Sequence, residues 1–190
     1  MESHHDFERL ALPQMEAAYN IAYWIVRSAP DAEDVVQDAY LRAYRAFDSW
    51  AGKQSPGGDI RPWLFTIVRN RAYQLLSQRK RRANVVSIED AFASRDDDGE
   101  VREPPSDDRS AEEILIRSAE QAVVRSALER LPQIFREVIV LREWEELSYQ
   151  AIAEVVGVPI GTVMSRLARG RDLLGRHLAQ LSTTETTHVV

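Results

Sequence analysis

Cysteine is absent from this chain of 190 residues. Its absence excludes a disulfide framework, a cysteine-ligated zinc site, an iron–sulfur centre and a thiol nucleophile. No run of about 18 apolar residues occurs, so we expect no membrane insertion. The N-terminus lacks a basic segment followed by an apolar one, so no secretory signal is expected and the default location is the cytoplasm. The four histidines lie mostly near the chain ends, and we predict no metal site and no cofactor.

Net negative charge is missing outside one segment, although the net charge of the whole chain is −6. Residues 89–113 hold 11 acids and 3 arginines, a net of −8, whereas residues 1–88 carry +2 and residues 114–190 carry zero. The acidic segment also contains Pro104-Pro105 and few large apolar residues. Such a composition cannot bury enough surface to offset the entropy of ordering, so it predicts a flexible linker.

Alternation with a period of two is also missing, and the apolar residues recur at helical spacing. The sequence therefore predicts an all-α protein of two small helical domains. We place the first domain at 1–83, the acidic linker at 84–113, the second domain at 114–182 and a frayed tail at 183–190.

The first domain is expected to contain three helices. Met15, Ala18, Ala22 and Ile25 form the apolar stripe of one helix. Asp31 is expected to cap a second helix. A Gly- and Pro-rich loop over 48–60 should follow, and then a third helix from Pro62 to about Arg82.

The second domain carries a helix-turn-helix pattern. Helices are expected over 110–131 and 135–142, followed by a short helix capped by Ser148 and ended by Gly157. The last helix should start after Pro159. The core between the last two helices is assigned to Ile152, Val155, Val158, Val163 and Leu167. The outer face of the last helix is assigned to Ile160, Thr162, Ser165, Arg166, Arg169 and Arg171. Such a face suits a DNA major groove, although a helical hairpin with a solvated arginine face is the alternative.

Two further patterns lie in the first domain. Residues 60–82 hold seven bases and no acid, beside Trp50, Trp63, Phe65 and Tyr73. Aromatic faces and arginines together suit single-stranded DNA, although the aromatics could instead be core residues and the basic run a solvated helix end. Asp34, Gln37 and Asp38 share a helix face that could meet a basic partner, or could simply be solvated.

These segments, in this order, resemble an extracytoplasmic-function (group 4) sigma factor of bacterial RNA polymerase. The resemblance rests on Asp31-Ala-Glu-Asp-Val-Val-Gln-Asp, on Arg61-Pro-Trp-Leu-Phe-Thr-Ile-Val-Arg-Asn-Arg, and on residues 131–142 with 146–171. It implies the second and fourth sigma domains, a promoter-specificity role and no enzymatic activity. The implied partners are core RNA polymerase, promoter DNA as duplex and melted strand, and an anti-sigma factor, with no stable homo-oligomer.

The resemblance also implies residue roles. Asp34, Gln37 and Asp38 would dock on the polymerase clamp helices. The loop 48–60 would capture a flipped base of the minus-ten element. The minus-ten surface would comprise Trp50, Arg61, Trp63, Arg69, Asn70, Arg71 and Tyr73. The minus-thirty-five surface would comprise Ile160, Thr162, Ser165, Arg166, Arg169 and Arg171.

The sequence departs from the family pattern at two places. Met164 stands where the family often has a basic residue, and the loop 48–60 is longer than usual.

Two other classes of protein would fit part of the sequence pattern. A dimeric helix-turn-helix repressor or response-regulator output would leave the basic aromatic segment unexplained. An enzyme with Mg²⁺ or Ca²⁺ at Asp96-Asp97-Asp98 would have to build its metal site in a flexible linker.

Overall fold

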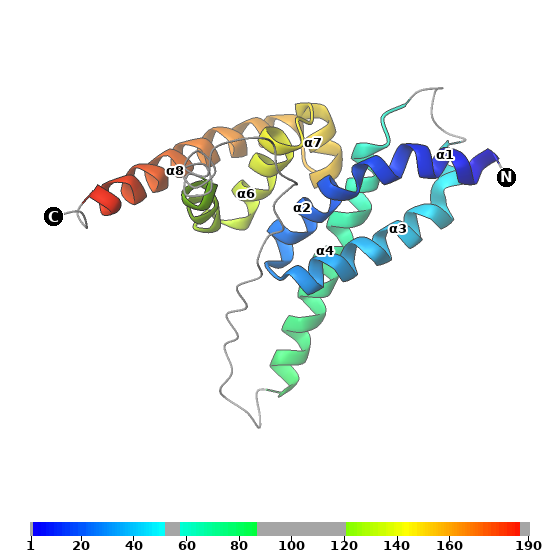
Figure 1. Ribbon diagram of the computed structural model, residues 1–190, viewed down its shortest axis with the longest axis horizontal. Coiled ribbons are helices and arrows are strands. Elements are labelled where there is room, and N and C mark those ends of the chain that lie inside the picture. Colours follow the sequence, from blue (N-terminus) through cyan, green and yellow to red (C-terminus); the bar gives the residue numbers. More distant parts are fainter. Residues whose placement is uncertain (1, 52–57, 87–120, 187–190) are drawn as a thin grey trace, which may run out of the picture.

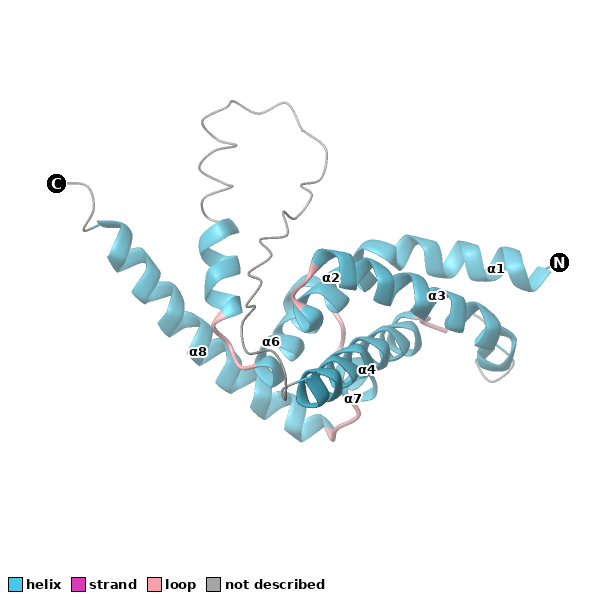
Figure 2. Ribbon diagram, turned by 90° about the horizontal axis from the view of Figure 1, so that it is seen from below, coloured by secondary structure: helices cyan, strands magenta, loops and turns pink. Residues whose placement is uncertain are grey.

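The computed structural model describes residues 2–51, 58–86 and 121–186. Helices fill most of these ranges and no strand occurs in them (Figure 2), which confirms the all-α prediction. The predicted linker 84–113 lies outside the described residues, except for the end of one helix. The elements are α1 (Glu2–Ala11), the 3₁₀ turn η1 (Leu12–Gln14), α2 (Met15–Val26), α3 (Ala29–Ala51), α4 (Arg61–Val86), a helical stretch over 121–129, α6 (Gln133–Ile139), the π-helical turn η2 (Val140–Trp144), α7 (Tyr149–Val156) and α8 (Ile160–Thr186).

The helices form two groups that lie side by side (Figure 1). In the first group, α2, α3 and α4 pack on one another around fully buried side chains of α4 such as Leu64, Phe65 and Val68. In the second group, α6 and α7 pack on α8. The groups also touch, since α2 contacts α6 and α4 contacts α7. Their buried apolar residues consequently form one continuous core.

Helix α1 is an element that the apolar pattern did not predict. The Tyr40 hydroxyl on α3 donates a hydrogen bond to the carbonyl oxygen of Ala11, the last residue of α1, at 2.8 Å. Burial raises the pKa of Tyr40 to about 12, so this hydroxyl keeps its proton. Phe7 packs edge-on against Phe47 with ring centroids 5.3 Å apart. These contacts attach α1 to the surface of α3.

The start of α3 differs from the prediction. The helix begins at Ala29, so Asp31 lies inside its first turn and is not the cap. Pro30 fits the first turn because its missing N–H has no partner there in any case, and the Ala32 N–H donates to the Ser28 carbonyl oxygen at 2.9 Å. Asp31 is buried and forms an ion pair with Arg79 of α4. The carboxylate therefore joins two helices, a role that a local capping pattern does not reveal.

Other helix boundaries also differ from the predicted ones. Helix α3 continues to Ala51, so the predicted loop 48–60 starts later, and residues 52–57 lie outside the described ranges. Helix α4 extends to Val86 instead of Arg82, and α8 extends to Thr186, into the predicted tail. The helix predicted over 135–142 is divided between α6 and η2. Local sequence signals specify helix ends only weakly, so boundaries are predicted less well than the helices themselves.

The helix-turn-helix prediction is confirmed in detail. The Ser148 Oγ accepts a hydrogen bond from the Ala151 N–H at 3.1 Å and caps α7. Gly157 ends α7 with φ of 70°, the left-handed conformation that glycine adopts without strain. Ile152, Val163 and Leu167 are at most 1% exposed between α7 and α8.

Among the described helices, no single one is long and apolar enough to cross a membrane. Tyr149–Val156 and Ile160–Leu181 reach that length and apolarity only when they are taken together, and the two are bent by 100° relative to each other.

Candidate functional site

The first three turns of α8 present the predicted duplex-reading face to solvent. Ile160 is 43% exposed, Ser165 and Arg169 are exposed, and Thr162 and Arg166 are half-buried. Met164 belongs to the same face and is 53% exposed, which adds an apolar side chain among the hydroxyls and arginines. This arrangement provides hydrogen-bond donors, positive charge and one apolar contact at the N-terminal end of a protruding helix.

Arg171, predicted for the same face, has a partner within its own domain. Its guanidinium donates to Glu143 Oε1 at 2.7 and 3.0 Å. Both side chains are close to half exposed, so solvent screens the pair and it contributes little stability. Arg171 lies past the first three turns and contacts Glu143 of η2, so it is not at the N-terminal end of the helix.

Two predicted aromatic residues stack on each other at the junction of α3 and α4. The rings of Trp50 and Trp63 lie 5.1 Å apart with an interplanar angle of 23°. Trp50 also packs on Phe47 of the core, and both tryptophans are half-buried. The stack therefore packs on the core and also offers partly exposed aromatic surface. Phe65, by contrast, is fully buried, so the core interpretation holds for it.

Three polar residues of α4 that were predicted to bind DNA differ in their exposure and their partners. Asn70 is exposed. Arg61 donates to Asp59 at 2.8 to 3.1 Å, a local pair at the start of α4. Arg71 forms an ion pair with Asp38 of α3. Of these three residues, only Asn70 projects into solvent without an ion-pair role.

Arg69 and Tyr73 meet a carboxylate from the second domain. The Arg69 Nε donates to Glu137 Oε1 at 2.6 Å, and the Tyr73 hydroxyl donates to Oε2 at 3.3 Å. The guanidinium also lies 4.7 Å from the centre of the Tyr73 ring. Burial, followed by the neighbouring Glu137 charge, raises the pKa of Tyr73 to about 12. The phenol therefore remains a donor at neutral pH. The apolar pattern gave no sign of Glu137, because its role depends on contact between distant helices.

The predicted acidic face of α3 is only partly free. Asp34 and Gln37 are exposed. Asp38 is half-buried and accepts a hydrogen bond from Arg42 at 3.0 Å in addition to its ion pair with Arg71. Asp38 thus helps to hold α3 against α4, and Asp34 and Gln37 are the members of this face that solvent reaches most freely.

Beside Gln37 lies an apolar groove that the sequence analysis missed. It has a volume of about 690 Å³ and is formed by α1, η1, α2 and α3. Four large apolar side chains in its lining are 43 to 52% exposed: Leu12, Met15, Leu41 and Tyr44. Met15 was expected in the buried stripe of α2. Leu41 and Tyr44 lie off the buried positions of α3, and that surplus of apolar residues was the available signal.

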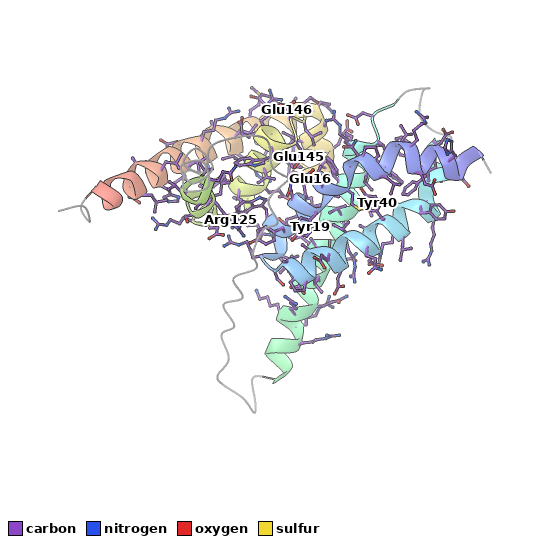
Figure 3. The ribbon with its side chains drawn as sticks, in the orientation of Figure 1. Glu16, Tyr19, Tyr40, Arg125, Glu145 and Glu146 are labelled. Carbon is purple, nitrogen blue, oxygen red and sulfur yellow. The ribbon has the colours of Figure 1, made fainter. Side chains whose placement is uncertain are left out.

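The interface between the domains contains one carboxylate with a perturbed pKa. Glu145, just after η2, lies close to Glu16 of α2 (Figure 3). Burial, followed by the negative charge of Glu16, raises the pKa of Glu145. No group of three or more metal-ligating side chains occurs in the part of the chain that the structure describes, and Asp96-Asp97-Asp98 lie outside it.

Both domains match models of a known family of transcription proteins. Residues 15–82 match sigma-70 region 2, and residues 121–174 match sigma-70 region 4. The first match covers α2, α3 and α4 up to residue 82, and the second ends inside α8. The fold and the two matched regions define a sigma-70-type subunit of RNA polymerase.

Similar curated proteins show which kind of sigma factor this chain is. The RNA polymerase sigma-H factor of Pseudomonas aeruginosa is 33% identical over 92% of this chain and 87% of its own length. The ECF RNA polymerase sigma-E factor of Escherichia coli K12 is 31% identical over 86% of this chain and 83% of its own length. The chain belongs to the extracytoplasmic-function sigma factors, and it acts as a promoter-recognition subunit of RNA polymerase.

Solved structures share the arrangement of helices. The sigma factor RpoE from Bartonella quintana, in complex with the anti-sigma factor NepR, matches with a TM-score of 0.66 and 29% identity, over 92% of this chain and 97% of that one. CnrH, in complex with the cytosolic domain of CnrY, matches with a TM-score of 0.59 and 26% identity, over 92% and 88% of the two chains.

Proposed function

We propose that this sigma factor divides its work among three surfaces. The polymerase-docking surface comprises Asp34, Gln37 and Asp38 on α3. The minus-ten surface comprises Trp50, Arg61, Trp63, Arg69, Asn70, Arg71 and Tyr73. The minus-thirty-five surface comprises Ile160, Thr162, Ser165, Arg166, Arg169 and Arg171. The division rests on the observation that the exposed N-terminal end of α8 belongs to the second domain, whereas the exposed groove and acidic face of α3 belong to the first.

The docking surface combines charge and apolar area. Gln37 lines the groove that exposes Leu41 and Tyr44. Asp34 is exposed one turn before Gln37 on the same helix. Exposed apolar residues gathered in one groove and bordered by polar groups are typical of protein-binding sites. Such a site suits a helical partner with basic side chains, so we assign the groove to polymerase docking together with the acidic face.

The DNA surfaces use different chemistry. Arg166 and Ser165 at the end of α8 suit base edges and phosphates of a duplex groove. Trp50, Trp63 and Asn70 suit unpaired bases, which stack on aromatic rings with about 1–3 kcal/mol per base. That gain offsets the few kcal/mol that unpairing and flipping a base costs.

The protein itself performs no reaction in this proposal, because the polymerase supplies the catalysis. It works in the cytoplasm, without a cofactor and without forming a stable homo-oligomer. The similar solved chains are held by NepR and by the cytosolic domain of CnrY, and we propose that an anti-sigma factor likewise inhibits this chain.

Two variants test the division of labour. Arg166→Ala should weaken recognition of the upstream promoter element by about 1–3 kcal/mol, because one arginine contact is lost. Gln37→Ala should weaken binding to core polymerase without changing promoter preference. The assays are run-off transcription on a genomic promoter library and pull-down with purified core polymerase.

Matched controls are available on exposed positions. Arg176→Ala removes an arginine further along α8, where it pairs with Asp172 of its own helix. Gln78→Ala removes an exposed glutamine of α4 outside the three surfaces. Both controls should behave as the unmodified chain does. Equal losses for Arg166→Ala and Gln37→Ala in both assays would refute the division of labour.

A further inference from the structure

We propose that Met164 is a specificity-determining residue of this chain: its side chain contacts the methyl group of a thymine in the major groove of the upstream promoter element. The inference rests on the proposed role of the minus-thirty-five surface on α8. It goes beyond that role because it adds a residue to the surface and names the base pair, A·T, that this residue selects.

Met164 is exposed, although it lies between buried residues of the same helix. Val163 is fully buried and Leu167 is 1% exposed, so the packed side of α8 is formed without Met164. Met164 itself is 53% exposed, the highest value for any large apolar side chain among the described residues. Packing inside the second domain therefore does not account for a methionine at this position.

Met164 belongs to an apolar strip on the outer face of α8. Ile160, four residues earlier, is 43% exposed, and Ala168, four residues later, is exposed as well. Residues four apart on a helix are neighbours on its surface. The strip therefore runs along the first turns of α8, which is the part of the second helix that reads base edges in helix-turn-helix proteins.

The nearest neighbours of Met164 on this face are small. Gly161, one turn earlier, has no side chain, and a Cβ added there would meet no other side chain within 4 Å. Ala168, one turn later, ends at its Cβ atom. The unbranched and flexible methionine side chain therefore extends beyond the local surface of the helix, and it can adapt to the shape of the groove floor.

The hydroxyl next to Met164 complements the same base pair. The Ser165 Oγ donates its proton to the carbonyl oxygen of Thr162 at 3.0 Å. Ser165 therefore keeps only its lone pairs for DNA and acts as an acceptor. In the major groove, adenine presents an amine that donates and thymine presents a methyl group. An acceptor beside an apolar side chain matches an A·T pair, whereas a G·C pair offers no methyl group.

The arginines of the same surface contribute in a different way. Arg166 is half-buried and Arg169 is exposed, and both follow Met164 closely on α8. Arginine contacts to phosphates position a protein on DNA without selecting a sequence, and they make its affinity depend on salt. Met164 carries no charge, so its contact is confined to a base edge. Replacing it with another uncharged residue should change base preference and leave the salt dependence of binding unaltered.

The test removes the methyl group of thymine and nothing else. Holoenzyme assembled from core polymerase and the full chain first selects promoters from a library with a randomised upstream element. Each thymine of the selected element, on either strand, is then replaced by deoxyuridine, which lacks only the methyl group. Burying one such group changes affinity by about fourfold. We therefore expect uracil at one of these positions to weaken holoenzyme binding by about fourfold.

Variants of the chain assign this effect to Met164. Met164→Gln keeps the length of the side chain but makes its end polar, so it should bind the thymine and uracil duplexes equally well. Met164→Leu stays apolar and should retain most of the difference. The matched control is Ile134→Ala, which removes an exposed apolar side chain of α6 outside the three surfaces and should respond to uracil as the unmodified chain does. Both positions are exposed, so these variants should fold.

The proposal is overturned if the selected element contains no A·T pair, if uracil weakens binding at no position, or if Met164→Gln shows the same weakening as the unmodified chain. Arg166→Ala separates these results from a failure of the proposed function. If Arg166→Ala weakens binding to the selected element while uracil does not, the minus-thirty-five surface stands and the role of Met164 fails. If neither Arg166→Ala nor Met164→Gln alters recognition of the upstream element, the proposed surface fails and the role of Met164 fails with it.

Discussion

Replacing Gly170 with alanine should loosen the packing of the DNA-reading helix on its own domain. Gly170 is buried where α8 crosses α6. An added Cβ would lie 2.8 Å from Ile139 Cδ1 and 3.3 Å from both Ile139 Cγ1 and Phe135 Cβ. Ile139 is fully buried, so its terminal methyl group has little space to move. Either α8 shifts away from α6 or the Ile139 side chain leaves its preferred rotamer.

The magnitude follows from two opposing effects. Overpacking a well-packed core costs about 1–3 kcal/mol. Replacing glycine with alanine inside a helix gains about 1 kcal/mol. The net effect of Gly170→Ala is therefore a loss of about 0–2 kcal/mol. Gly175→Ala on the same helix gains the propensity alone, because nothing lies within 4 Å of its added Cβ.

Thermal unfolding followed by circular dichroism compares the two variants. For a chain of this length, 1 kcal/mol corresponds to a shift of about 2–4 °C in Tm. We expect Gly170→Ala to melt several degrees below Gly175→Ala and to bind minus-thirty-five duplex more weakly. If Gly170→Ala raised the Tm as much as Gly175→Ala does, the proposed close approach of α6 and α8 would be refuted.

Two further predictions concern the cap of α7 and the pH response of the interface. Ser148→Ala should cost about 1 kcal/mol in the free energy of unfolding, because the Ala151 N–H loses its partner; an unchanged Tm would contradict the capping role. Burial raises the pKa of Glu145, so the folded chain binds a proton there more readily than the unfolded chain. Acidification from neutral pH should therefore add stability, and this contribution is lost as the pH rises through the raised pKa. Chemical unfolding at a series of pH values should show this dependence, and Glu145→Gln should remove it; the same pH dependence in Glu145→Gln would refute the assignment.

The features that the sequence predicted well are those with local causes. Ser148 caps the start of α7 with its side chain, and Gly157 ends the helix in a left-handed conformation; both roles were predicted. Ile152 and Leu167 repeat at helical spacing and are buried together. Helical periodicity and capping depend on residues that are only a few positions apart, so they can be predicted from a single sequence.

The features that the sequence missed depend on contacts between distant segments. Asp31 carries the signature of a helix cap, but its partner is Arg79 on another helix. Glu137 has no local feature that distinguishes it from a solvated acid, and its role appears only when α6 meets α4. The groove at Leu41 exists because no other helix covers this face of α3 in the described structure. Apolar periodicity does not indicate whether such a face is covered. These are tertiary properties, and single-sequence patterns do not specify them.

The stacked pair of Trp50 and Trp63 has a consequence for how the protein can diversify. The two rings join the last turn of α3 to the first turn of α4, so both ends of the intervening segment are fixed by the core and not by the segment itself. Because both ends are held from outside the segment, we propose that its length and sequence can change promoter preference while the scaffold on either side stays the same.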